Sequence, residues 1–97
     1  MTAKRADDYL DHAARDIKDR AASRNQADGE RSMTKAVAAN NALYGRGLNE
    51  LEGWQVMSFL KKARGAGGAY REDDHVDDVA YCALAAEAAA KIEGDKR

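Results

Sequence analysis

Proline is absent from the 97-residue sequence, and cysteine, tryptophan and phenylalanine occur once each. Because proline removes a backbone donor and breaks helices, its absence permits long helices. The single cysteine, Cys82, excludes an internal disulfide and fits a reducing compartment. No apolar run is long enough to cross a bilayer, and the charged first residues lack the apolar core of a signal peptide. We therefore expect a cytoplasmic protein without membrane contacts.

An excess of charge of one sign is also missing. The 16 Lys and Arg residues nearly balance the 17 Asp and Glu residues, for a formal net charge of −1. This balance argues against a strongly basic, histone-like binder of nucleic acid. Charged residues make up 34% and apolar residues 44%, which is typical of a globular chain. We expect a single domain over 1–97, with frayed ends at 1–3 and 94–97.

The spacing of apolar residues and the positions of glycine predict helices and no strands. Asn49, with Glu52 three residues later, forms the sequence pattern of a capping box at the start of the third helix. Apolar residues surround much of this helix, which predicts a central position with Trp54 in the core and an end at Gly65. The fold class is therefore all-α, a compact bundle of about four helices over about 4–23, 30–44, 50–65 and 73–94.

The apolar core of such a bundle is thin, because few large apolar side chains are spread over four helices. The last helix is rich in alanine, and small residues let another helix approach closely, from the same chain or from a second copy. Domains of this size often gain stability by oligomerising. A homodimer is therefore one expectation from the sequence.

The best candidate for a binding surface is the basic end of the third helix and the glycine-rich loop after it. Cations there suit the phosphates of a nucleic-acid strand, and a nearby tyrosine suits a stacked base. The alternative interpretation is an ordinary helix C-terminus, where cations complement the helix dipole, followed by a loop. The candidate residues are Lys61, Lys62, Arg64, Tyr70 and Arg71.

The acidic run over 72–78 is the candidate for metal chemistry. Its carboxylates and imidazole could gather on one helical turn and bind a hard cation, with Glu50 and Glu52 as further ligands. Acids at a helix start also cap free N–H groups and suit the helix dipole, and we favour this second interpretation. We expect neither a metal nor a cofactor, and the residues of the alternative metal site are Asp74, His75, Asp77 and Asp78.

Nucleophilic catalysis has little support in the sequence. Cys82 lies among alanines, where a thiol is expected to be inert packing. Ser32 and Ser58 have no histidine and acid at suggestive positions. His12 lies on a helix face full of charged residues, where a nearby carboxylate is expected to be incidental. The glycines of 65–68 follow a helix rather than a strand, unlike those of a phosphate-binding loop. The sequence predicts a protein that is not an enzyme.

Five short segments occur in order between Glu30 and Ala90, namely ERSM, ANNAL, LNELEGW, LKKAR and DDHVDDVAYCALAAE. Together they resemble a family of small phage and prophage helical proteins of uncharacterised function. The resemblance implies a mobile-element origin and a bacterial host cytoplasm. The helix–loop–helix with acids near residue 77 is also faintly similar to the all-α nucleotide pyrophosphohydrolases of the MazG type. That family holds magnesium with an EExxE run and a later ExxD pair, whereas this chain has only Glu50-Leu-Glu52 and, at best, Asp74 and Asp77.

The small size, the balanced charge and the phage resemblance predict a non-enzymatic phage binding protein. The leading hypothesis is an inhibitor of host bacterial defence, similar in role to anti-CRISPR proteins. It would bind single-stranded DNA or a host defence effector protein through the basic residues of 61–71. One alternative is a magnesium-dependent nucleotide pyrophosphohydrolase-like protein that uses the acids of 50–52 and 74–78. Another is a purely structural or regulatory phage protein.

Overall fold

The computed structural model describes residues 3–23 and 32–96, and these ranges form four helices without any strand. The all-α class is therefore confirmed. None of the four helices is both long and apolar enough to cross a membrane. The expected start of the second helix near Glu30 lies outside the described residues. The helices are α1 (Ala6–Ser23), α2 (Ser32–Tyr44), α3 (Glu50–Gly67) and α4 (Glu72–Asp95).

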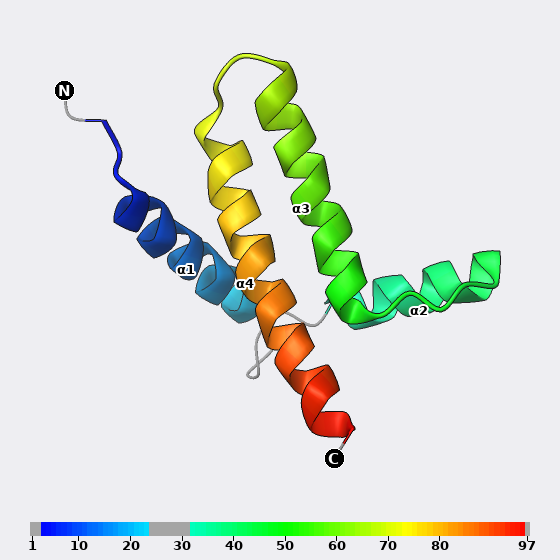
Figure 1. Ribbon diagram of the computed structural model, residues 1–97. Coiled ribbons are helices and arrows are strands. Elements are labelled where there is room, and N and C mark those ends of the chain that lie inside the picture. Colours follow the sequence, from blue (N-terminus) through cyan, green and yellow to red (C-terminus); the bar gives the residue numbers. More distant parts are fainter. Residues whose placement is uncertain (1–2, 24–31, 97) are drawn as a thin grey trace.

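The centre of the structure is a hairpin of α3 and α4, which lie side by side and are joined by a short loop (Figure 1). Its core contains Trp54 from α3 and Tyr81 from α4, whose rings stack with centroids 5.8 Å apart. Leu84, Ala85 and Ala88 of α4 complete this cluster of buried residues. The predicted core position of Trp54 is confirmed, because its side chain is only 7% exposed.

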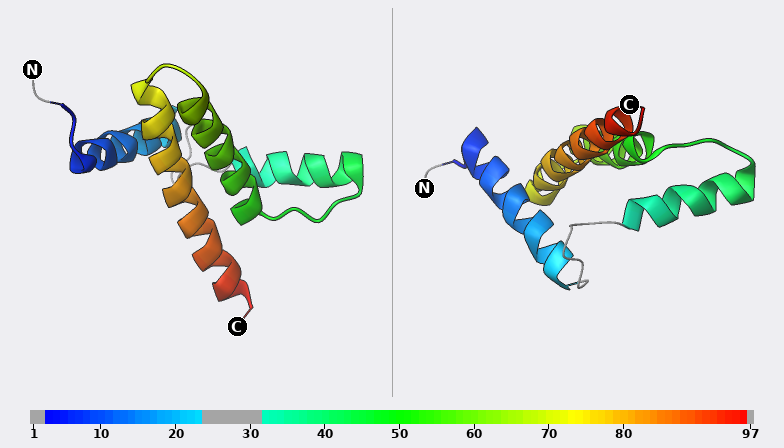
Figure 2. Two further views of the ribbon diagram at one scale, coloured as in Figure 1. Left: turned by 45° about the horizontal axis from the view of Figure 1, so that its top comes forward. Right: turned by 90° about the horizontal axis from the view of Figure 1, so that it is seen from below.

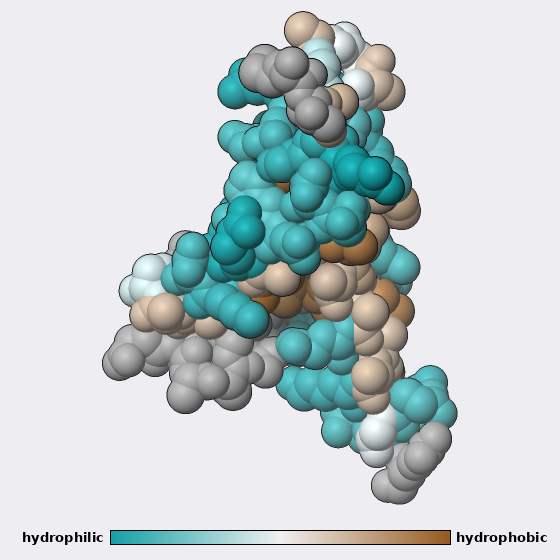
Figure 3. Space-filling model, turned by 90° about the vertical axis from the view of Figure 1, so that its left-hand side faces the viewer, coloured by the Kyte–Doolittle hydropathy of each residue, from teal (hydrophilic) through white to brown (hydrophobic). Residues whose placement is uncertain are grey.

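The first helix packs against α4 through small side chains. Ala13 of α1 meets Val76 and Ala80 of α4, and all three are buried. Because these residues are small, the two helices approach closely over this short contact. Viewed from the α1 side, hydrophilic residues cover much of the upper half and apolar residues gather around the middle of the molecule (Figure 3). The polar face of α1 is therefore in solvent, as expected from its charged residues.

The second helix packs only against α3 among the described helices, and it projects from the hairpin (Figures 1 and 2). The contact is centred on Gly53, where an added Cβ would lie 2.5 Å from Met33 Sδ and 2.9 Å from Val37 Cγ1. Only glycine therefore permits the observed approach of α2. The side chain of Asn41 holds the loop between α2 and α3, accepting from Leu48 N at 2.9 Å and donating to Leu48 O at 2.8 Å.

The start of α3 is as predicted, and its end is not. Asn49 and Glu52 form a complete capping box, with bonds of 2.8 and 3.0 Å. The helix continues past the predicted end at Gly65 to Gly67. Gly65 faces α4, where an added Cβ would lie 3.5 Å from the His75 ring. Packing against the start of α4 supports these two additional helical residues. The contact joins two helices, so the pattern within the third helix could not predict it.

The start of α4 also differs from the prediction. The helix begins at Glu72 with Arg71 in the N-cap position, and Arg71 makes no side-chain capping bond. The interpretation of the acids at 73–74 as capping residues is therefore wrong. They lie inside the first turn, where their charge still complements the helix dipole.

The molecule is elongated rather than spherical, because α2 projects from the hairpin. Its radius of gyration is 14.9 Å and its principal extents are 49 × 31 × 27 Å. A compact domain of the same length has a radius of gyration of about 12.5 Å. The difference means that a large share of each helix surface is not covered by another helix of the same chain.

Candidate functional site

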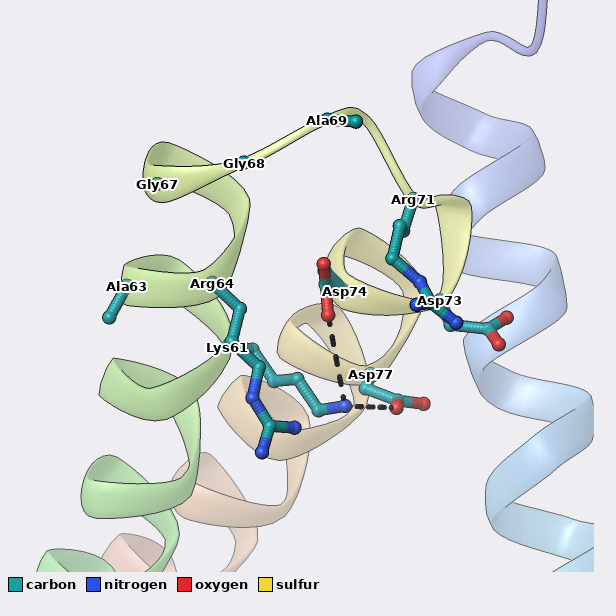
Figure 4. A pocket seen from close by; sticks show the side chains of 10 residues that line it. All are labelled: Lys61, Ala63, Arg64, Gly67, Gly68, Ala69, Arg71, Asp73, Asp74 and Asp77. Atoms are coloured by element: carbon teal, nitrogen blue, oxygen red, sulfur yellow. Dashed lines mark ion pairs between the residues drawn. The ribbon is translucent and has the colours of Figure 1, made fainter.

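Lys61, the first residue of the predicted basic surface, lies between α3 and α4. Its Nζ is 2.9 Å from Asp77 Oδ2 and 4.0 Å from Asp74 Oδ1 (Figure 4). The side chain of Lys61 is only 13% exposed, and that of Asp74 is 9% exposed. Arg20 of α1 approaches the same Asp77 at 3.7 Å. Lys61 is therefore a charge neutralised within the helix hairpin, and a phosphate would have to displace Asp77 to reach it.

Lys62 is neutralised by a different acid. Its Nζ donates to Asp78 at 2.8 and 2.9 Å and to Ser58 Oγ at 2.7 Å. Ser58 Oγ donates to the same carboxylate, and Cys82 Sγ lies 3.6 Å from Asp78 Oδ1. This cluster was not among the sites predicted from the sequence. Its only sequence signal is a spacing of four residues within each helix, 58 with 62 and 78 with 82, and only the pairing of α3 with α4 brings the two pairs together.

The protonation states of this cluster are those of an ion pair. The hydrogen bond with Asp78 raises the pKa of Lys62 above its ordinary value. Burial pushes the pKa of Asp78 upward, but the hydrogen bonds from Lys62 and Ser58 outweigh burial and lower that pKa overall. A lysine held in its protonated form does not accept the proton of Ser58, and the lowered pKa of Asp78 makes the neighbouring carboxylate a weak base for that proton.

Cys82 does not occupy the buried position that was predicted for it. Its side chain is exposed on the surface of α4, beside Ser58 and Lys62. The prediction of inert packing was wrong because the alanines before and after Cys82 do not share one face. Successive helical residues are separated by about 100°, so Cys82 points about 200° away from the buried Ala80.

The two arginines of the predicted surface have no acidic partner in the part of the chain that the structure describes. Arg64 and Arg71 line an open hollow of about 850 Å³ at the loop between α3 and α4 (Figure 4). The hollow also contains Lys61 and the acids Asp73, Asp74 and Asp77. Its three cations and three acids balance, so it does not produce the strong positive field of a dedicated polyanion site.

Tyr70 lies in the same loop and is held from two sides. Its hydroxyl is 2.6 Å from the hydroxyl of Tyr9, and its ring stacks on His75 with centroids 5.5 Å apart. The bond with Tyr9 raises the pKa of Tyr70 to about 12. The side chain nevertheless remains 64% exposed. Tyr70 is therefore an oriented and accessible aromatic ring next to Arg71.

The acids considered for a metal site are engaged separately. Asp74 and Asp77 face Lys61, Asp78 faces Lys62, and His75 stacks on Tyr70. Glu50 accepts from Thr34 at 2.7 Å and pairs with Lys91 at 3.6 Å, while Glu52 closes the capping box. Among the described residues, no three His, Cys, Asp or Glu side chains are grouped as metal ligands.

No protein-family model, curated protein or solved structure matches this chain at a significant level. The candidate site is therefore defined by its own geometry. Arg64 and Arg71 line the hollow and Tyr70 adjoins Arg71 in the loop, and we call these three residues the arginine corner.

Proposed function

We propose that this protein is a non-enzymatic binding protein whose arginine corner contacts a short stretch of single-stranded nucleic acid. The observation that carries the proposal is the pairing pattern of the cations. Lys61 and Lys62 are held by acids of α4, whereas Arg64 and Arg71 line one hollow without an acidic partner among the described residues. Arginine suits phosphate because its planar group donates two parallel hydrogen bonds.

Tyr70 completes the proposed contact. An exposed aromatic ring next to a phosphate-binding cation can stack on a base of any sequence, since every base has a π-face. The bond to Tyr9 and the stacking on His75 orient the ring before a strand arrives. Less side-chain entropy is then lost on binding. We therefore expect binding that depends weakly on base sequence.

The number of available cations determines the expected salt dependence. For a single strand, the slope of log K against log salt is about −0.7 for each phosphate contacted. Two arginines correspond to a slope of about −1.4, whereas all four cations of the predicted surface would correspond to about −2.8. The proposal therefore requires weak binding with a shallow salt dependence.

Fluorescence anisotropy with a labelled oligothymidine, titrated at several salt concentrations, tests this proposal. We expect a slope near −1.4 and loss of binding in the double variant Arg64→Ala/Arg71→Ala. Arg15→Ala is the matched control, because it removes an exposed arginine on α1, about 200° around that helix from the buried Ala13. A slope near −2.8 would show that Lys61 and Lys62 exchange their ion pairs with α4 for contacts with phosphates. Unchanged binding in the double variant would show that the arginine corner is not the binding site.

The phage resemblance extends the proposal to a biological role. We propose an inhibitor of host defence in a bacterial cytoplasm, acting on a defence effector protein or on the single-stranded DNA that the effector exposes. Plaque counts on a host with active defence, with and without this protein, test the role. The Arg64→Ala/Arg71→Ala variant is expected to lose protection. If anisotropy detects no DNA binding at low salt, a pull-down with the effector decides between the two partners.

A further inference from the structure

The outer surface of α3 is unusually apolar for a helix in contact with water. Val56, Phe59 and Leu60 are 55%, 63% and 40% exposed. They lie on the side of α3 opposite to Trp54, which is buried against α4. A helix that is apolar on nearly all sides is normally surrounded by other helices. Here α4 covers one side and the first half of α2 covers another, so the outer side of α3 lacks a covering element in the described chain.

This surface continues into an open groove between α3 and α4. The groove has a volume of about 400 Å³. Lys62 is its one charged lining residue in the described structure, and Asp78 neutralises it. Cys82 points away from the face of α4 that α1 covers, so α1 does not reach this side of the hairpin. The other main lining residues are Leu51, Gln55 and Phe59 of α3 and Cys82, Ala86 and Ala89 of α4.

The chain as a whole exposes more surface than a compact monomer of its mass. The chain has an accessible surface of 6949 Å². A folded monomer of 10.5 kDa is expected to expose about 5,400 Å². The excess of about 1,500 Å² is roughly twice the 800 Å² that each partner buries in a standard interface. This excess belongs to the whole chain, so it allows an interface of standard size without locating it on α3.

The shape and charge of this surface fit a second copy of the same chain. A large side chain, Phe59, lies beside a depression lined by the small residues Ala86 and Ala89. In a two-fold symmetric contact the same patch faces itself, so a projecting ring next to a shallow groove is self-complementary. Because the Lys62–Asp78 pair is neutral overall, the groove itself adds no like-charge repulsion between two copies.

We infer that the groove and the outer face of α3 form the interface of a symmetric homodimer. In this dimer, Phe59 of the partner subunit occupies the alanine-lined groove of the first. The interface lies on a different part of the hairpin from the arginine corner, and its test does not depend on nucleic-acid binding.

Sedimentation velocity at several protein concentrations tests the inference. We expect a species of twice 10.5 kDa for the unaltered chain. Phe59→Asp should weaken dimerisation at least about 30-fold, since it replaces a phenyl ring that the dimer would bury by a charge. Ala86→Arg, which fills the groove, should act in the same direction. Leu10→Asp on α1 is the matched control, because Leu10 is 59% exposed against 63% for Phe59, and it should remain dimeric.

The thiol of Cys82 supplies a second readout. It lines the groove, so its reaction with Ellman's reagent should be slow at dimer-forming concentrations and fast in Phe59→Asp. Circular dichroism verifies that each variant keeps its helices. A 10.5 kDa species at about 100 µM overturns the inference, since a dimer with a standard interface is expected to persist there. Equal dissociation of Leu10→Asp and Phe59→Asp, or Cys82 reactivity independent of concentration, overturns it as well.

Discussion

At the scale of single residues, neighbouring cations of the same helix have different roles. Lys61 and Lys62 are consecutive, yet the first pairs with Asp77 in the hairpin interior and the second with Asp78 at its edge. The rotation of about 100° per residue directs each lysine at a different acid of α4. The sequence correctly marks a basic segment, but which cations remain available depends on the acids of another helix.

Replacing Asp77 by Asn should destabilise the fold more than replacing an exposed acid. Lys61 would keep only Asp74, at 4.0 Å, as its acidic neighbour. Losing one partner of a fully buried pair costs about 3–5 kcal/mol, and the partial exposure of this pair lowers our expectation to about 2 kcal/mol. Urea denaturation at fixed protein concentration measures the change. Glu93→Gln, in an exposed pair with Lys96, should cost at most about 0.5 kcal/mol. Equal costs would contradict a structural role for the Lys61 pair.

The lowered pKa of Asp78 predicts a dependence of stability on acid. Because the folded-state pKa lies below the ordinary value of 3.8, the unfolded chain takes up this proton first as the pH falls. The contribution of Asp78 is therefore complete above pH 4 and is lost below it. Urea midpoints at pH 6 and pH 3 should differ less in Asp78→Asn than in the unaltered chain. An equal difference in both proteins would show that the Lys62–Asp78 pair contributes nothing.

At the scale of elements, interactions within one turn set the start of α3, whereas a contact with another helix set its end. The start of α3 was predictable because Asn49 and Glu52 interact within one turn. The end of α3 was not, because Gly65 stays helical while it packs against His75 of the next helix. The approach of α2 to α3 likewise depends on the missing side chain of Gly53.

Two glycine-to-alanine variants of α3 should therefore have opposite effects. Gly65→Ala should stabilise the protein by up to about 1 kcal/mol, because alanine favours the helix and its Cβ meets His75 at an ordinary 3.5 Å. Gly53→Ala gains the same propensity but collides with Met33 and with Val37, a stiff β-branched residue. We expect α2 to detach from α3, with increased amide exchange confined to α2. Undisturbed exchange in α2 of Gly53→Ala would argue against close packing at this point.

At the scale of the whole molecule, stability should be unequal because the packing is unequal. The hairpin of α3 and α4 contains the stacked Trp54 and Tyr81, whereas α2 ends in Leu43 and Tyr44, which are 77% and 70% exposed. Segments with few buried contacts open first. Hydrogen exchange should be slowest in the hairpin, intermediate in α1 and fastest in the second half of α2. Uniform protection across the four helices would mean that α2 is covered in solution.

The open arrangement also explains why the sequence suggested a central position for α3. Its apolar residues face in nearly all directions, as in a helix surrounded by others, but the chain places α4 and part of α2 around it and leaves Val56, Phe59 and Leu60 exposed. The homodimer interface inferred above resolves this conflict, because a second copy would cover the remaining side.

Sequence patterns alone predicted the all-α class, the four helices, the cap of α3 and the core position of Trp54. These properties arise from residues close together in the chain or from the periodicity of one helix, so they can be read locally. Helix packing, in contrast, neutralises Lys61 and Lys62, places Arg64 and Arg71 in one hollow, and brings Ser58 and Cys82 beside Asp78. Each of these facts depends on which face of α3 meets which face of α4. Side chains three or four residues apart share one face of a helix, whereas consecutive side chains point in different directions.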